Sequence, residues 1–234
     1  MLGHTIIDEN TGLEICFETT PNMFPKAWYS ETINAKAVSL EKKHHQRIKK
    51  TILLSLKKYP SQLIRENLKK IFLLQKIQFY GLNYGGTYSK DSIFITNTSV
   101  NFYIEKAFHH EFSHILFKNL KFFFKEKQWE SINSKKFHYG DGGVEALKNN
   151  KHSQIPKKTF HKDGLLHEYA TSALKEDFAS IAENLFLPIN GFKDLIDKYE
   201  RIKQKRILAI EFYQRINKNL SQNYFDQILE NRTE

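Results

Sequence analysis

The residues best placed to do chemistry are two histidines and a glutamate within five positions, His110, Glu111 and His114. In a helix, positions i and i+4 lie one turn apart on the same face, so both imidazoles can bind one Zn²⁺. Glu111 lies beside them, where it can act as general base toward a water molecule that the metal activates. The pattern predicts the active-site helix of a zinc metallopeptidase, although so short a motif also arises by chance.

A catalytic zinc site needs a third protein ligand and an open coordination position. The compact continuation that supplies a third histidine is absent, since Phe117 and Leu120 occupy its glycine and histidine positions. The third ligand is therefore expected farther along the chain. Glu176 is a candidate, because it lies off the apolar stripe of a helix predicted over 171–187. The alternative for Glu176 is an exposed acid in the first helical turn, where the helix dipole favours it.

Two segments together resemble a known family. His-His-Glu-Phe-Ser-His-Ile-Leu-Phe at 109–117 and Glu-Tyr-Ala-Thr-Ser-Ala-Leu-Lys-Glu-Asp-Phe-Ala at 168–179 resemble the zinc-binding metallopeptidases found among bacterial surface lipoproteins. The spacing from Tyr169 to Glu176 is also similar to that in the catalytic domain of anthrax lethal factor. The resemblance covers residues 75–186. It implies that Glu176 is the third zinc ligand and that the Tyr169 hydroxyl stabilises the transition state; otherwise Tyr169 is a core aromatic.

Several other residues are weaker candidates for the site. His109 adjoins the motif but points about 100° around the helix from His110. Asp177 or Glu183 could orient a ligand histidine through a hydrogen bond, with an exposed carboxylate as the alternative for Asp177. His167 is the one histidine near Tyr169 that merits testing as a ligand. The glycine-rich stretch at 139–143 is interpreted as a turn, because no Gly-Lys-Ser/Thr follows it to make a phosphate loop.

Hydrophobic periodicity predicts the elements that must position these residues. Residues 1–35 are expected to be irregular or in short strands. Helices are predicted over 40–56 and 61–74, strands over 76–80 and 92–96 around a glycine turn, and then the motif helix with a core stripe of Ile104, Phe108, Phe112 and Ile115. Residues 131–168 form a long, loose stretch, and helices follow over 171–187, 192–218 and 223–230. The strand over 92–96 is expected to be the edge strand that aligns an extended substrate.

These elements predict an α+β, zincin-like metallopeptidase domain, mostly helical, with a small mixed or antiparallel sheet. The 234 residues are assigned to one domain, 1–234. Within it, 1–74 is a mostly helical N-terminal part, 75–187 the catalytic core and 188–234 a helical tail.

Composition excludes several function classes. Cys16 is the only cysteine, so neither an internal disulfide nor a cysteine-based zinc site is possible within one chain. The net charge of +10 is spread along the chain without a basic block, which argues against nucleic acid as a partner. No apolar run is long enough for a transmembrane segment, and residues 1–9 lack the features of a signal peptide. The family resemblance nevertheless implies an extracytoplasmic or surface location.

The leading hypothesis is Zn²⁺-dependent hydrolysis of a peptide or protein substrate, with Glu111 as general base. One alternative is a non-catalytic zinc-binding or scaffold protein with a zincin fold, although such a protein does not need Glu111. A second alternative is an effector protease that acts on one protein target. The sequence leaves the cleavage specificity and the oligomeric state open.

Overall fold

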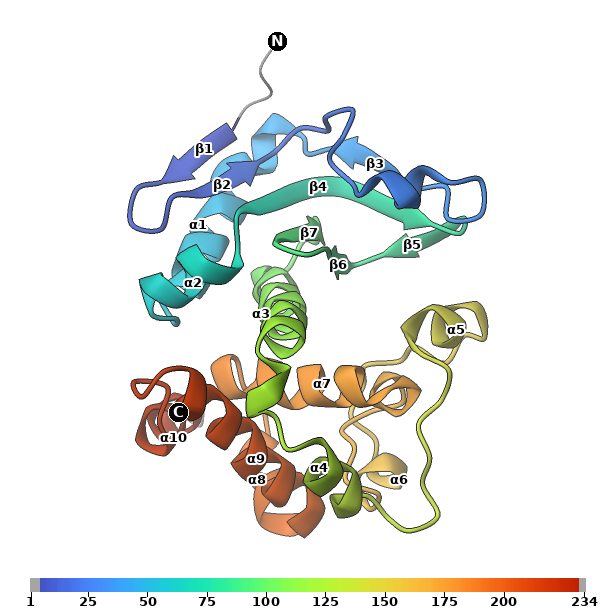
Figure 1. Ribbon diagram of the computed structural model, residues 1–234, viewed down its shortest axis with the longest axis vertical. Coiled ribbons are helices and arrows are strands. Elements are labelled where there is room, and N and C mark those ends of the chain that lie inside the picture. Colours follow the sequence, from blue (N-terminus) through green and yellow to red (C-terminus); the bar gives the residue numbers. More distant parts are fainter. Residues whose placement is uncertain (1–4, 232–234) are drawn as a thin grey trace. The chain divides into compact units, whose positions relative to one another are not determined.

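A computed structural model describes residues 5–231, and the chain divides into two compact units, residues 1–119 and residues 120–234. The first unit carries a sheet with helices, and the described part of the second contains helices without strands (Figure 1). The predicted α+β class with a mixed sheet is confirmed. Residues 1–4 of the predicted N-terminal segment and 232–234 of the predicted tail lie outside the described residues. The assignment of one domain to 1–234 stays a prediction.

The sheet of the first unit has seven strands, in the order β1-β2-β4-β7-β6, with β3 and β5 also paired to β4. The long strand β4 is parallel to β2 and β7, whereas β3 and β5 pair antiparallel with its second half. β6 pairs antiparallel with β7 and is the terminal strand on that side. The bounds are β1 (Thr5–Asp8), β2 (Leu13–Cys16), β3 (Lys36–Ser39), β4 (Lys70–Phe79), β5 (Leu82–Tyr84), β6 (Gly86–Tyr88) and β7 (Ser92–Thr96).

Both faces of the central strands are buried. Phe72 of β4 and Phe94 of β7 are paired in register and stack at 5.0 Å on one face, within a core that includes Met23 and Phe24. Because side chains alternate along a strand, Ile93 and the other odd-numbered residues of β7 face the opposite side. There α3 (Asn101–Asn119) packs against β6 and β7.

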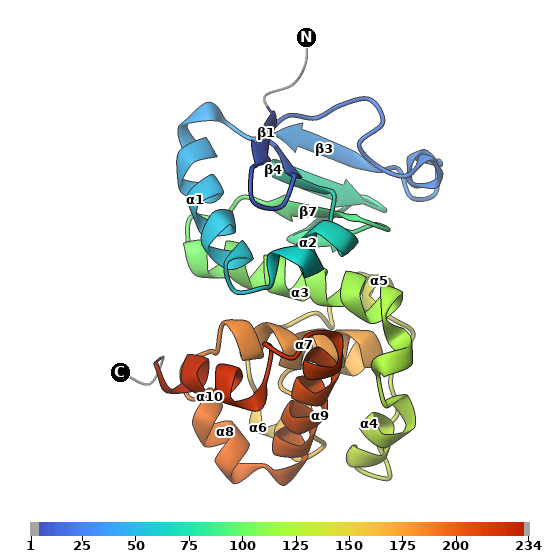
Figure 2. The same ribbon diagram turned by 60° about the vertical axis from the view of Figure 1, so that its left-hand side comes forward.

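The helices of the first unit gather around α3. α1 (His45–Leu56) and α2 (Ser61–Asn67) both contact α3, and Figure 2 shows the three helices together on one side of the sheet. The motif helix is present as predicted, and its expected core stripe is buried. Two short 3₁₀ helices complete the unit, η1 (Lys26–Tyr29) and η2 (Lys42–His44).

The helix predicted over 61–74 is wrong in its second half. α2 ends at Asn67; the next residue, Leu68, has the extended conformation (φ −129°, ψ 126°), and β4 begins at Lys70. The apolar run Ile71–Leu74 is buried on both faces of the sheet. A continuous run of this kind fits a helical stripe and a fully buried strand equally well, so periodicity alone did not separate them.

The predicted edge strand is also placed differently. Ser92–Thr96 is a strand, β7, but it lies between β4 and β6 and therefore has a hydrogen-bonded neighbour on each side. The edge is β6, inside the stretch that the glycines at 81, 85 and 86 had assigned to a turn. Three-residue strands such as β5 and β6 are too short to produce a periodic signal.

The second unit is built around α7 (Leu174–Phe186), which is buried from Glu176 to Phe186. α9 (Glu200–Ile216) and α10 (Gln222–Glu230) pack against α7 with an aromatic core that includes Phe178 and Tyr213. The helix predicted over 192–218 is two helices, because Tyr199 (φ −119°, ψ 98°) interrupts it. The remaining elements are α4 (Glu126–Ile132), α5 (Gly143–Lys148), α6 (Lys158–His161), α8 (Phe192–Lys198), η3 (Lys121–Phe123) and η4 (Tyr169–Ser172).

The long stretch predicted to be loose carries α5 and α6. Its glycine-rich segment is fixed to η4, since the N–H groups of Gly140 and Gly142 donate to the carbonyls of Thr171 and Ser172. Among the described residues, no helix has the length and apolar character needed to cross a bilayer.

Candidate metal centre

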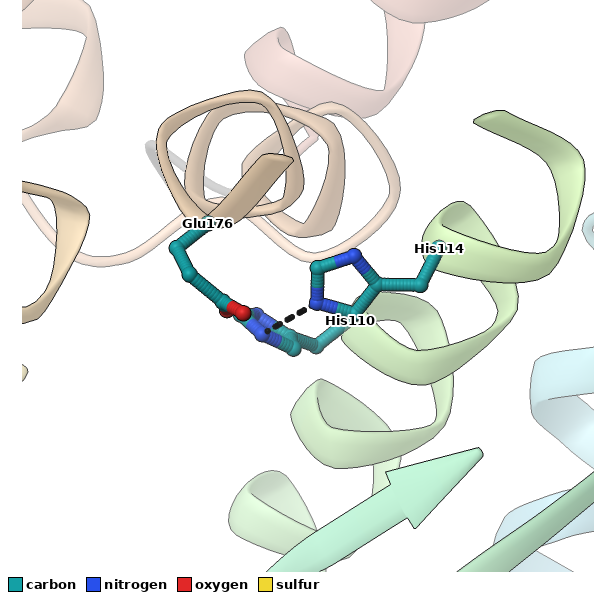
Figure 3. Close-up of side chains that lie close together, drawn as sticks. All are labelled: His110, His114 and Glu176. Atoms are coloured by element: carbon teal, nitrogen blue, oxygen red, sulfur yellow. Dashed lines mark hydrogen bonds between the residues drawn. The ribbon is translucent and has the colours of Figure 1, made fainter. Parts of the chain in front are cut away.

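His110 and His114 lie one turn apart on α3, and both rings are buried. Their Nε2 atoms are 3.2 Å apart, and the ring planes are inclined by 81° (Figure 3). Two nitrogens bound at about 2.0–2.1 Å to one tetrahedral zinc lie about 3.3 Å apart. The two imidazoles are therefore already arranged as a pair of ligands would be.

Glu176, the predicted third donor, lies in the first turn of α7. One carboxylate oxygen and the two imidazole nitrogens all lie within 4.8 Å of one another, and Figure 3 shows the carboxylate pointing toward the rings. Among the described residues, this trio is the group of three histidine, cysteine or acidic side chains placed to share a metal. Two nitrogens and one oxygen, with room for a fourth ligand, form the donor set of a catalytic zinc site. The residues therefore fit zinc.

Burial supports the same interpretation of Glu176. The residue is 4% exposed, so it is not the solvated first-turn acid that the alternative required. Placing a carboxylate inside a protein is costly unless it is paired or binds a metal. Lys175 Nζ lies 3.8 Å from Oε1 of Glu176, and the role of the carboxylate as a ligand stays a prediction.

Glu111 lies beside the metal ligands on α3, next to the edge strand. A β-carbon added to Gly86 of β6 would lie 2.9 Å from Oε1 of Glu111, so the carboxylate rests against a residue without a side chain. Two residues along the same strand, the Tyr88 ring stacks on His114 with centroids 4.8 Å apart and planes 19° apart. β6 therefore contacts both the candidate base and a candidate ligand.

Tyr169, at the start of η4, lies on the same side of the second unit as Glu176. A β-carbon added to Gly143 would overlap the Tyr169 hydroxyl, and Oε1 of Glu176 would lie 3.4 Å from that β-carbon. The structure therefore brings the hydroxyl of Tyr169 and the carboxylate of Glu176 to one glycine. The predicted role of Tyr169 in the reaction stays a prediction.

His109 contacts residues that stabilise the fold. It is fully buried, its Nδ1 lies 2.9 Å from the Tyr59 hydroxyl, and its Nε2 lies 3.4 Å from Oε1 of Glu105. Glu105 also pairs with Lys58 at 2.7 Å. Burial raises the pKa of Glu105, but the hydrogen bonds and charges of His109 and Lys58 outweigh it and hold the pKa at about 2. His109 is thus part of a cluster that ties α3 to the segment after α1.

Asp177 is neither an exposed acid nor the partner of a ligand histidine, so both expectations for it are wrong. It is fully buried, and its Oδ2 accepts hydrogen bonds from three side chains of the second unit. The donors are Trp129 Nε1 at 2.8 Å, the Tyr139 hydroxyl at 2.6 Å and Lys205 Nζ at 2.6 Å. These groups come from 28 to 48 residues away, which is why spacing along the helix did not reveal them.

The remaining candidates lie outside the metal-binding trio. His167 is buried, and its Nδ1 accepts the backbone N–H of Ala170, so the ring caps the start of η4. Glu183 is buried on α7, and its predicted role in orienting a ligand stays a prediction.

The sequence interpretation missed residues that shape the site without carrying its chemistry. Gly86, Tyr88 and Gly143 lie against Glu111, His114 and Tyr169, yet two of them had been assigned only to turns. The available signal was the presence of paired glycines, Gly85-Gly86 and Gly142-Gly143, at segments that flank the motifs.

Comparisons with known proteins identify a family and a similar fold. A family model described as "Putative zinc-binding metallo-peptidase" matches residues 68–225. A solved structure with the same description, from Bacteroides caccae, is similar with a TM-score of 0.54 and 16% sequence identity, covering 81% of this chain and 75% of that one. At this identity the likeness shows the fold alone. No curated protein matches the chain.

Proposed function

Since the chain belongs to this family of zinc-binding metallo-peptidases, we propose that it hydrolyses peptide bonds with a zinc ion held by His110, His114 and Glu176. One observation carries the proposal: three buried donor atoms within 4.8 Å of one another, with Glu111 on the same helix as two of them. The resemblances to surface lipoproteins and to lethal factor, and the location that they imply, stay predictions.

Each residue has a distinct task in the proposed reaction. When bound, zinc supplies a Lewis acid that polarises the scissile carbonyl and eases deprotonation of a water molecule. Glu111 accepts the proton of the attacking water and then delivers it to the leaving amine nitrogen, so one carboxylate acts as base and then as acid. The Tyr169 hydroxyl donates a hydrogen bond to the former carbonyl oxygen as that oxygen gains negative charge.

Substrate alignment is assigned to β6. An extended peptide can add to the edge of a sheet through backbone hydrogen bonds. β7 has strand neighbours on both sides, whereas β6 is the terminal strand and contacts Glu111 and His114. A peptide paired with β6 would therefore run past the candidate base and ligand.

The experiment compares the zinc-reconstituted protein with its Glu111→Gln variant on a peptide library. The amide keeps the shape of the side chain but cannot accept a proton, so we expect turnover to fall by roughly 10²-fold to 10⁴-fold or more. Zinc content and melting temperature should not change. Glu130→Gln, at an exposed position of α4, is the matched control and should retain full turnover.

Metal binding is tested separately by elemental analysis. The wild-type protein should bind one zinc per chain, and His110→Ala/His114→Ala should bind none. Zinc retained in that double variant would exclude the assigned ligands. Stoichiometric zinc without hydrolysis of any peptide would instead favour the non-catalytic binding protein.

A further inference from the structure

Two glycines beside the proposed site are not explained by their backbone conformation. Glycine is needed where φ is positive, because other residues rarely adopt that region. Five glycines of the described chain meet this condition, and Gly86 and Gly143 do not; the five are Gly12, Gly81, Gly142, Gly164 and Gly191. A residue with a side chain could therefore take the backbone conformation of either position.

At position 86 a larger residue is disfavoured because the Glu111 side chain fills the space that its β-carbon would need. An added β-carbon would lie 2.9 Å from Oε1, 3.2 Å from Cγ and 3.4 Å from Cδ of Glu111. The first distance is closer than carbon and oxygen atoms pack, so the carboxylate would have to move. Neighbouring Gly85 has no such limit, since nothing lies within 4 Å of its added β-carbon.

At position 143 a larger residue is disfavoured in the same way, because Tyr169 fills the space. An added β-carbon would overlap the Tyr169 hydroxyl and would lie 3.2 Å from its Cζ. Oε1 of Glu176 is 3.4 Å away, an ordinary contact that requires no movement. Gly140, on the same segment, would meet only the backbone of η4, at 3.6 Å or more.

We propose that Gly86 and Gly143 are positioning residues, which leave the space that Glu111 and Tyr169 need in order to face the substrate. The inference rests on the proposed peptidase function. In both cases the obstructed atoms belong to side chains and not to backbone, so the side chain can shift without a change in the course of the chain. An alanine would thus leave the fold intact and displace the reacting group, and a displacement of about 1 Å can cost 10²-fold in rate.

The test uses four zinc-loaded variants of the full chain, in two matched pairs. Gly86→Ala is compared with Gly85→Ala, and Gly143→Ala with Gly140→Ala. We expect kcat to fall about 10²-fold in Gly86→Ala and about 10-fold to 10³-fold in Gly143→Ala, by analogy with losing one oxyanion donor. KM, melting temperature and zinc affinity measured by chelator competition should match those of the controls.

A kinetic cycle separates action through Tyr169 from a general disturbance. If Gly143 acts by placing the hydroxyl, Gly143→Ala should cause little further loss of kcat in a Tyr169→Phe protein. Additive losses would overturn this half of the proposal. A crystal structure of Gly86→Ala should show the Glu111 carboxylate rotated away from β6, and an unmoved carboxylate would overturn the other half.

The remaining outcomes distinguish the two levels of inference. Wild-type activity with equal kcat in Gly86→Ala and Gly85→Ala would reject the positioning role and leave the peptidase function standing. A rise in KM alone would mean that the methyl group obstructs substrate on β6 and not Glu111, which also rejects the role. A zinc-loaded wild type without activity would reject the peptidase function, and the positioning role with it.

Discussion

The two helices that carry the proposed ligands are each anchored by a buried polar cluster, and the clusters differ in their access to water. On α3, His109 precedes the ligand His110 and contacts Tyr59 and Glu105. On α7, Asp177 follows the ligand Glu176 and accepts three hydrogen bonds. In each unit, the residue adjacent to a ligand holds the helix in place.

The charged pair of the α3 cluster is partly exposed, whereas the charged pair of the α7 cluster is fully buried. The side chains of Lys58 and Glu105 are 28% and 18% exposed, whereas those of Lys205 and Asp177 are both 0% exposed. Burial lowers the pKa of Lys205, although the charge of Asp177 opposes this shift. Water can therefore replace a lost charged partner more readily at Glu105–Lys58 than at Asp177–Lys205. The α7 cluster should therefore be the more sensitive to substitution.

The largest effect is expected from breaking the dry ion pair. Asp177→Ala leaves Lys205 buried without its counter-charge, which typically costs about 3–5 kcal/mol in unfolding free energy. Chemical denaturation would measure it, with exposed Asp197→Ala as the control. Asp177→Leu/Lys205→Met should lose less than the single variant, because no buried charge remains. A loss below about 1 kcal/mol in Asp177→Ala would show that water enters this cluster.

The second prediction tests whether Tyr169 acts on the substrate or only stabilises the fold. Tyr169→Phe removes a hydroxyl proposed to bond only the developing oxyanion, so kcat and kcat/KM should fall together by roughly 10-fold to 10³-fold. Melting temperature and zinc content should stay at wild-type values. The exposed Tyr103→Phe serves as the control. Unchanged kcat with zinc bound would make Tyr169 a core aromatic.

A matched pair of hydroxyl deletions compares the clusters directly. Tyr139 donates to the charged Asp177, so Tyr139→Phe should cost about 1.5–3 kcal/mol, whereas Tyr59→Phe, which faces a histidine, should cost about 0.5–1.5 kcal/mol. Both losses of unfolding free energy should be measured by chemical denaturation of the metal-free protein. Equal losses would mean that the difference in solvent access does not control stability.

The smallest effect concerns acid stability and the cluster on α3. The ordinary pKa of Glu105, 4.5, falls to about 2 in the folded protein, since His109 and Lys58 outweigh the effect of burial. The carboxylate therefore contributes stability above pH 4.5 that is lost as pH falls toward 2. Because the pair is partly exposed, we expect roughly 1–2 kcal/mol. Metal-free Glu105→Gln should lose less stability than the wild type over this range; parallel curves would contradict the assignment.

Local patterns predicted much of the fold and the trio of ligands. The spacing of His110 and His114 makes sense only on a helix, and a helix places residues four apart on one face whatever surrounds it. The helix over 171–187 followed from its apolar stripe and from Pro188, and Glu176 followed from its place off that stripe together with the family resemblance. The helices and the histidine pair needed only residues close to one another in the chain, whereas the assignment of Glu176 also needed the family resemblance.

Contacts between distant residues required the tertiary structure. The run Ile71–Leu74 is a strand because the sheet buries both of its faces, and β7 is central because β6 pairs with its free side. Asp177 finds its partners on α4, on α9 and beside Gly140. None of these strand positions and side-chain partners produces a recognisable pattern in neighbouring residues of the sequence.

The sequence by itself determined which side chains could bind zinc and activate water, because backbone hydrogen bonding within one helix sets their spacing. Only the tertiary structure decided which carboxylate is an anchor, which strand is the edge, and that glycines stand beside Glu111 and Tyr169. Those properties depend on burial and on the space between packed elements, which hydrophobic periodicity does not encode.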